Sequence, residues 1–402
     1  MENLSFFLIF LGLSIVVALI FSRGATLIKS PLIVGYIITG AILGPSITGF
    51  IGFDKIKSLE IVNIVTLSLI GFGIGGALRW KEIKKLGKVI IFTLFFESLG
   101  AFFLVGIILS ILLNNIPLGI IFGALAVATA PAATVEVIKQ YKAKGSLTTT
   151  LYAIVGLDDI LALLIFIIAM PIALVFFGVR DAGAGQGILH ALGLAGLETL
   201  ITIGIGIAVG FILMLVIKRM HERVTILLFS IGVILLNCGV AETLNLSPIL
   251  LNMTMGIVAV NLNAINSRKI FSALGDWSPP VYVWFFVLVG ARLDLPTLIK
   301  YGGLAIVYIL ARSTGKWIGC FVGGHLSHAK NSIKKYLGFC LLDQAGIAIG
   351  LALAASKTLE KIGFSEYSSQ IMSTITATTF LVMLVGPIFL KYALFKSGDA
   401  KV

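Results

Sequence analysis

The stretch VGLDDI, residues 155–160, places Asp158 and Asp159 side by side inside an apolar run from Thr148 to Gly178 that has no other charged residue. A membrane-spanning helix needs about 20 apolar residues to cross about 30 Å of hydrocarbon. Asp158 lies roughly ten residues into this run, which is near mid-membrane at about 1.5 Å per residue. A charge at that depth costs at least about 2.5 kcal/mol, so we expect both acids to face protein or water and to serve a function.

The composition of the whole chain is that of a polytopic helical membrane protein. Of the 402 residues, 58% are hydrophobic and 12% are charged, which predicts an all-α membrane protein and excludes a soluble domain. The net charge of +12 would suggest nucleic-acid binding in a soluble protein. Here the basic residues lie in short loops between apolar spans, so we expect membrane lipid and no nucleic acid as a partner, and no cofactor.

The apolar runs predict thirteen transmembrane helices within a single membrane transporter domain, residues 1–402. The loop 179–186 would join two approximate halves, 1–178 and 187–402, and we expect no soluble regulatory domain. The predicted spans lie near 4–22, 31–49, 59–78, 89–113, 117–139, 148–176, 191–217, 224–243, 247–263, 278–292, 301–324, 336–356 and 369–391.

The distribution of basic residues predicts the orientation in the membrane. Lysines and arginines favour the loops after odd-numbered spans and the C-terminal tail by about three to one. Cytoplasmic loops carry this excess in membrane proteins. We therefore predict a multi-pass protein of the cell (inner, or plasma) membrane, with its N-terminus outside and its C-terminus in the cytoplasm.

Two basic residues lie inside the eleventh predicted span. Arg312 is about eleven residues into the span, again near mid-membrane, and Lys316 follows one turn later on the same helix face. Lipid tolerates neither these cations nor the buried acids, so we expect the two groups to face each other. We predict that Arg312 is the charge partner of Asp158, with Asp343 or Glu97 as its competing partner.

Two other spans carry helix breakers and polar residues at their centres. In span five, Pro131 follows Thr129 and Ala130, and its missing N–H and its ring predict a break in the helix. In span twelve, Gln344 and Gly346 interrupt an apolar run in the same way. Two broken helices that cross the membrane in opposite directions, one in each half, are typical of inverted-repeat transporters, in which carbonyls at the break bind the transported ion.

Several classes of membrane protein contain intramembrane acids. An intramembrane aspartyl protease needs carboxylates that meet across helices, whereas adjacent residues on one helix point about 100° apart. A cation channel needs a ring of acids or carbonyls around one axis, and no filter-like segment occurs. We therefore predict a secondary active antiporter rather than an enzyme, in which a cation and protons compete for the acids. An organic-anion symporter of similar fold remains open, since half-helix amino ends favour anions.

Four stretches spaced along the chain share their pattern with one known family. They are PLIVGYIITGAILGP at 31–45, GLDD at 156–159, FFVLVGARLD at 285–294 and ARSTGKWIG at 311–319. Together they resemble the monovalent cation/proton antiporter-2 family. The resemblance implies the sodium/proton antiporter fold, with thirteen spans, two crossed broken helices, a core domain, a dimerisation domain that forms a homodimer, and an elevator movement.

The same resemblance implies roles for individual residues. Asp159 matches the carboxylate that binds the transported ion, and Asp158 matches the carboxylate that meets a basic partner. Thr129 and Ala130 match the unwound segment of a broken helix. The implied substrates are Na⁺ and protons, with K⁺/H⁺ exchange as the alternative and Li⁺ also open.

The chain departs from this family at the basic partner. Electrogenic members usually carry a lysine there, and the spacing of Gly315 and Gly319 assigns Arg312 to that position, with Lys316 one turn further on. Arginine stays protonated in proteins, so it cannot imitate a lysine that loses its proton during each cycle.

Overall fold

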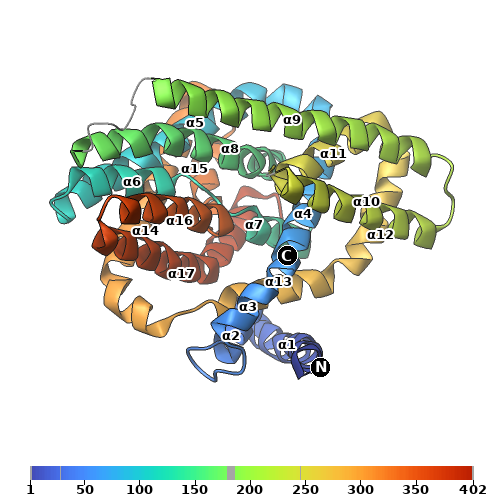
Figure 1. Cartoon of the computed structure of the whole chain (residues 1–402). Coiled ribbons are helices and arrows are strands. Elements are labelled where there is room, and N and C mark those ends of the chain that lie inside the picture. Colours follow the sequence, from blue (N-terminus) through green and yellow to red (C-terminus); the bar gives the residue numbers. More distant parts are fainter. Residues whose placement is uncertain (1, 28, 179–185, 245, 401–402) are drawn as a thin grey trace. The chain divides into compact units, whose positions relative to one another are not determined.

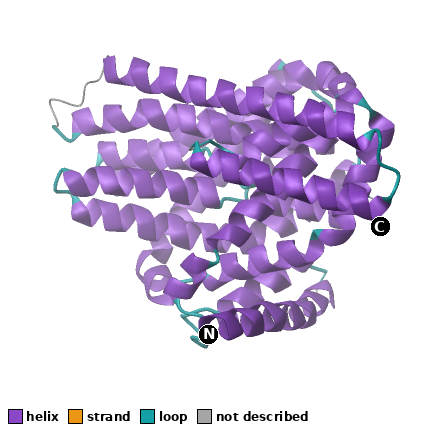
Figure 2. Cartoon of the chain, turned by 45° about the vertical axis from the view of Figure 1, so that its right-hand side comes forward, coloured by secondary structure: helices purple, strands orange, loops and turns teal. Residues whose placement is uncertain are grey.

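The computed structural model describes residues 2–27, 29–178, 186–244 and 246–400, and all regular structure in these ranges is helical (Figure 1, Figure 2). Nine described helical segments are long and apolar enough to cross a membrane, one of which, Ile116–Gln140, consists of two helices in line. Three shorter helices, Leu32–Leu43, Pro248–Leu262 and Pro279–Ala291, are also apolar. The predicted all-α membrane class is therefore confirmed.

The chain forms two compact units, each built from two separate stretches of sequence. Unit 1 combines Met1–Lys84 with Leu197–Leu293, and unit 2 combines Lys85–Gly196 with Asp294–Val402. Both predicted halves of the chain therefore contribute to each unit. The predicted joining loop, 179–186, lies outside the described residues except for its last position.

Unit 1 is held together by closely packed helix pairs. Glycines allow α4 to approach α11 and α2 to approach α13: a Cβ on Gly75 would lie 2.0 Å from the Met253 carbonyl oxygen, and one on Gly40 would lie 1.9 Å from that of Val287. Small residues permit such backbone contact between membrane helices. The helices of unit 1 are α1 (Glu2–Leu27), α2 (Leu32–Leu43), α3 (Phe53–Ser58), α4 (Glu60–Ala77), α10 (Arg223–Thr243), α11 (Pro248–Leu262), α12 (Ala264–Trp277) and α13 (Pro279–Ala291).

Unit 2 repeats one order of helices. A long helix is followed by an interrupted helix and then by another long helix, first from α5 to α8 and again from α14 to α17. α5 begins in the first stretch of unit 1, and α9 (Gln186–Ile217) continues from unit 2 into unit 1. The remaining elements are α5 (Trp80–Leu112), α6 (Ile116–Ala126), α7 (Pro131–Gln140), α8 (Ser146–Phe176), α14 (Leu295–Leu326), α15 (Asn331–Tyr336), the 3₁₀ turn η1 (Leu337–Cys340), α16 (Gly346–Lys361) and α17 (Ser365–Ser397).

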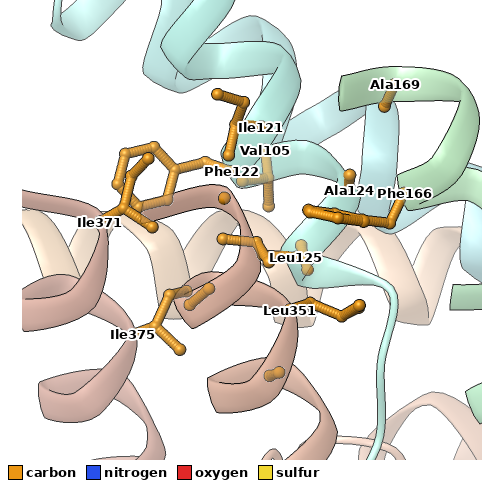
Figure 3. Packing of buried hydrophobic residues seen from close by; sticks show 14 of the residues in the cluster. Val105, Ile121, Phe122, Ala124, Leu125, Phe166, Ala169, Leu351, Ile371 and Ile375 are labelled. Carbon is orange, nitrogen blue, oxygen red and sulfur yellow. The ribbon is translucent and has the colours of Figure 1, made fainter. Parts of the chain in front are cut away.

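The apolar core of unit 2 joins six of these helices, with Tyr308 and Ala311 as the contribution of α14. Figure 3 shows Val105 of α5, Leu125 of α6, Phe166 of α8, Leu351 of α16 and Ile375 of α17 converging on one buried cluster. Between helices in a membrane the stabilisation comes mainly from van der Waals contact, because lipid tails are as apolar as the side chains they replace. The cluster therefore fixes both interrupted helices against the helix that carries Asp158 and Asp159.

The start of α8 is capped by a residue from the end of the chain. Gly145 precedes the helix and has no side chain to cap it, and the Asp399 carboxylate takes that role. Asp399 Oδ2 accepts hydrogen bonds of 2.8 Å from both the N–H and the hydroxyl of Thr148, while Lys144 N donates to the Asp399 carbonyl at 2.7 Å. A Cβ on Gly145 would lie 2.1 Å from Asp399 Oδ1, so the glycine leaves room for the cap.

We predict that Asp399→Ala destabilises the protein by about 1 kcal/mol, the usual effect of removing a helix N-cap. Thermal unfolding of the purified protein in detergent measures the loss. Asp399→Asn is the matched control, because an amide oxygen also accepts from Thr148 N. Equal unfolding temperatures for Asp399→Ala and the unmodified protein would show that the cap contributes nothing.

Candidate functional site

The first helix break lies between α6 and α7. α6 ends at Ala126 and α7 begins at Pro131, so the predicted interruption of span five is confirmed. Proline is favoured at this first helical position because its missing N–H would have no partner there. The ribbon changes from helix to extended chain beyond the labelled Leu125 (Figure 3).

The second break lies between η1 and α16 and contacts the first. η1 ends at Cys340 and α16 begins at Gly346, which confirms the predicted interruption around Gln344. Ala130 N donates a hydrogen bond of 2.9 Å to the Asp343 carbonyl, so backbone from one break pairs with backbone from the other. This hydrogen bond uses only one carbonyl, so the other carbonyls of the two breaks need donors from elsewhere in the protein.

Arg312 of α14 supplies those donors. Its side chain is fully buried, with Nε 2.9 Å from the Ala126 oxygen and Nη1 2.6 Å from that of Leu342. Nη2 donates to the carbonyls of Ala128 at 2.7 Å and Asp343 at 3.3 Å. One guanidinium therefore bridges the two breaks through four backbone acceptors.

The prediction that Arg312 holds the Asp158 carboxylate is wrong. The planar fork of the guanidinium is taken up by carbonyls, and Lys316, one turn later, reaches Asp158 instead. Asp343 does contact Arg312, but through its backbone oxygen. The buried carboxylate oxygens of Asp343 have no hydrogen-bond partner within the described part of the chain.

Lys316 occupies the centre of a buried ionic cluster. Nζ lies 2.5 Å from Glu97 Oε2, 2.7 Å from the Val127 carbonyl and 3.5 Å from Asp158 Oδ2. The three ionisable side chains are 0% exposed, so Lys316 does not extend toward an interface. Ser98 donates to Glu97 Oε1 at 3.0 Å and lies 3.4 Å from Asp158 Oδ1.

Close packing of α5 and α14 brings Glu97 and Lys316 together. A Cβ on Gly319 would lie 2.1 Å from the Phe96 carbonyl oxygen, and one on Gly315 would lie 2.4 Å from that of Gly100. Both distances are far below van der Waals contact, so the two backbones meet here. Gly315 and Gly319, whose spacing was used to compare this span with a known family, therefore also bring Glu97 and Lys316 together.

Asp159 and Thr129 each carry a buried oxygen that has no hydrogen-bond partner among the described residues. Asp159 follows Asp158 on α8, and its Oδ1 is buried without a hydrogen-bond partner among the described residues. The Thr129 hydroxyl, in the first break, is likewise buried and unpartnered in that part of the chain. Unpaired buried oxygens are costly, and carboxylate, hydroxyl and carbonyl oxygens are groups that bind alkali cations at helix breaks.

Other members of the site serve the scaffold. Gln344 donates to the Leu125 carbonyl at 2.7 Å and to the Tyr308 hydroxyl at 3.0 Å, which ties the second break to α6 and α14. Neither Tyr308 nor Ser98 is among the site residues predicted from the sequence. Ser98 could have been found as a hydroxyl next to the intramembrane acid Glu97, whereas the carbonyl acceptors have no side-chain signature.

The chain matches a known protein family and a curated relative over most of its length. The family described as "Sodium/hydrogen exchanger, transmembrane" matches residues 8–396. A curated relative, Na(+)/H(+) antiporter 1 of Methanocaldococcus jannaschii, is 24% identical over 405 residues, covering 94% of this chain and 92% of the relative.

Solved structures have the same fold. The sodium proton antiporter MjNhaP1 from M. jannaschii at pH 8 aligns with a TM-score of 0.72 and 23% identity, covering 99% of this chain and 98% of that one. A second structure, from electron microscopy of the same antiporter, aligns with a TM-score of 0.75 and 21% identity over 98% of both chains.

We predict that Arg312→Lys destabilises the protein although it keeps the positive charge, because an ammonium cannot span four carbonyls with a planar fork. Each buried carbonyl left without a donor costs about 1–3 kcal/mol, so unfolding in detergent should shift by several degrees. Arg292→Lys, at a partly exposed ion pair with Glu60, is the matched control and should change little. Equal stability of the two variants would argue against the bridging role.

Gly319→Ala should separate α5 from α14 and weaken the Glu97–Lys316 contact, because its methyl group would overlap the Phe96 carbonyl. Overpacking of this kind costs about 1–3 kcal/mol. Gly303→Ala on the same helix has open space at its Cβ and should be neutral or slightly stabilising. Thermal unfolding of both variants decides the point, and an unaffected Gly319→Ala would mean that the two helices can move apart freely.

Proposed function

Because this chain belongs to the sodium/hydrogen exchanger family, whose members are transporters and not enzymes, we propose that it is a secondary active antiporter that exchanges sodium for protons. The observation that carries the proposal is a pair of adjacent carboxylates within α8, one of them fully buried, which Lys316 connects to a helix break. Asp158 lies against Lys316, Lys316 donates to the Val127 carbonyl in the break, and the next residue, Asp159, has an unpartnered oxygen.

Exchange requires that cation and protons compete for one set of oxygens. With both carboxylates ionised, Asp159 binds the cation, and the Thr129 hydroxyl and the carbonyls near Ala130 complete its shell. With both protonated, the carboxylates have no charge with which to hold a cation. Each ligand therefore displaces the other, and a change of access between the two sides of the membrane transports both.

The architecture supports alternating access. The repeated order of helices in unit 2 fits an inverted repeat whose two interrupted members are joined by the Arg312 bridge. We assign thirteen membrane crossings by adding the interrupted pair η1 and α16 to the nine long and three short apolar helices. Unit 2 would be the moving core of an elevator, and unit 1 the dimerisation domain of a homodimer.

The proposed orientation has the N-terminus outside and the C-terminus in the cytoplasm of the cell membrane. The contacts of Asp399 with Lys144 and Thr148 support it, because they bring the C-terminal end next to the loop between α7 and α8. Both segments are rich in lysine and would share the cytoplasmic side under the positive-inside rule.

The function is tested by proton flux in proteoliposomes, with sodium, lithium and potassium added in turn under a clamped voltage. Sodium-dependent proton movement is expected. Proton flux with potassium alone would favour the potassium/proton alternative. Uptake of a radiolabelled organic anion without cation-dependent proton release would favour a symporter of similar fold instead.

Asp159→Asn should abolish this exchange while leaving the fold intact, because the cation loses a full counter-charge and the amide cannot take up a proton. Asp158→Asn should be milder. Asp54→Asn, an exposed acid on α3, is the matched control and should transport normally. Flux at the unmodified rate in Asp159→Asn protein of normal unfolding temperature would contradict the assigned site.

A further inference from the structure

An exposed row of rings runs along one face of α14. Trp317 stacks on Phe321 with 5.8 Å between ring centroids, and the Phe321 centroid lies 4.3 Å from that of His325, one turn later. Trp317 and Phe321 are 37% and 39% exposed. Residues four apart lie on the same face of a helix, so the three rings form one continuous strip.

Phe339 joins this strip to an exposed face of α17. Its ring centroid lies 6.4 Å from that of Trp317, 6.1 Å from that of Phe389 and 6.5 Å from that of Tyr392. Phe389 and Tyr392 are 40% and 49% exposed. We call the surface formed by Trp317, Phe321, Phe339, Phe389 and Tyr392 the aromatic surface of unit 2.

Two exposed lysines border the aromatic surface. Trp317 Nε1 donates a hydrogen bond of 3.3 Å to the Lys335 carbonyl, which places the end of α15 beside the rings. On α17, Lys396 Nζ lies 6.0 Å from the centroid of the Tyr392 ring. Positive charge therefore lies next to the exposed rings on both α15 and α17.

The segments that form this surface carry no acid to balance the lysines. Residues 295–342 and 367–398 contain neither aspartate nor glutamate. Asp399, the first acid after α17, accepts two hydrogen bonds from Thr148 at the start of α8. Exposed lysines in acid-free segments, next to exposed rings, favour a ligand that has both a negative charge and an apolar part.

We propose that the aromatic surface of unit 2 binds an anionic phospholipid. Its acyl chains lie on the rings of Phe321 and Phe389, and Lys335 and Lys396 attract its phosphate. Both α14 and α17 are long and apolar enough to cross a membrane, so the surface between them contacts lipid rather than a soluble partner. Aromatic and basic side chains occur together at the level of the lipid headgroups.

A lipid bound here would stabilise the second helix break from outside. Phe339 belongs to η1, and the residues that follow η1 include Leu342 and Asp343, whose carbonyls bind Arg312. An acyl chain across Phe339 and its aromatic neighbours would hold η1 against α14 and α17. Removing the lipid should therefore lower the unfolding temperature without changing which ions are exchanged.

The test is a lipid titration of the purified protein in detergent, read out by native mass spectrometry. Phosphatidylglycerol should bind more tightly than phosphatidylcholine, because only phosphatidylglycerol has a net negative charge. Lys335→Gln/Lys396→Gln should weaken phosphatidylglycerol binding about thirtyfold, since each lysine near an anionic headgroup contributes about fivefold. The matched control, Lys357→Gln/Lys361→Gln, removes two exposed lysines of α16 and should keep the affinity of the unmodified protein.

A phosphatidylglycerol with a diazirine in its acyl chain locates the bound lipid. Irradiation should label peptides that contain Phe321 or Phe389. Labelling only outside α14 and α17, equal affinity for the two lipids, or equal phosphatidylglycerol affinity in the two double variants would each overturn the proposal. The lipid comparison and the labelling use the unmodified protein, so they do not depend on the folding of a variant. None of these measurements involves transport, so their failure would leave the proposed exchange untouched.

Discussion

Backbone carbonyls at a helix break within a membrane must find their donors inside the protein, because lipid offers none. In this chain that constraint is met by Arg312. Its guanidinium binds the carbonyls of Ala126, Ala128, Leu342 and Asp343, and so joins two segments that are more than two hundred residues apart. A rigid planar fork with five donors suits this task better than a flexible ammonium with three.

The rest of the site follows from this bridge. With Arg312 directed at the breaks, Lys316 one turn later faces the same region, and the close approach of α14 to α5 at Gly319 brings it against Glu97. Asp158 then meets Lys316 from α8. The two cations of α14 therefore have different roles. Arg312 binds backbone carbonyls, and Lys316 pairs with carboxylates.

Most of this site could be predicted from the sequence because charged residues are rare inside a membrane. Asp158, Arg312 and Lys316 were recognised in this way, and the helix breakers Pro131 and Gly346 indicated the two breaks. Which cation meets which acid could not be predicted, because one helical turn decides the pairing and the carbonyls that occupy Arg312 leave no trace in the sequence. The cap of α8 by Asp399 could not be predicted either, because it joins segments that are far apart in the sequence. The helix α12 was missed because its polar residues are typical of a loop between spans.

A single site for cation and protons is tested most directly by calorimetric sodium binding to the purified protein at a series of pH values. If the same carboxylates hold either ligand, sodium affinity should fall about tenfold per pH unit for each proton displaced as the pH is lowered, because proton and cation binding are linked. Sodium affinity that does not change with pH would contradict a shared site.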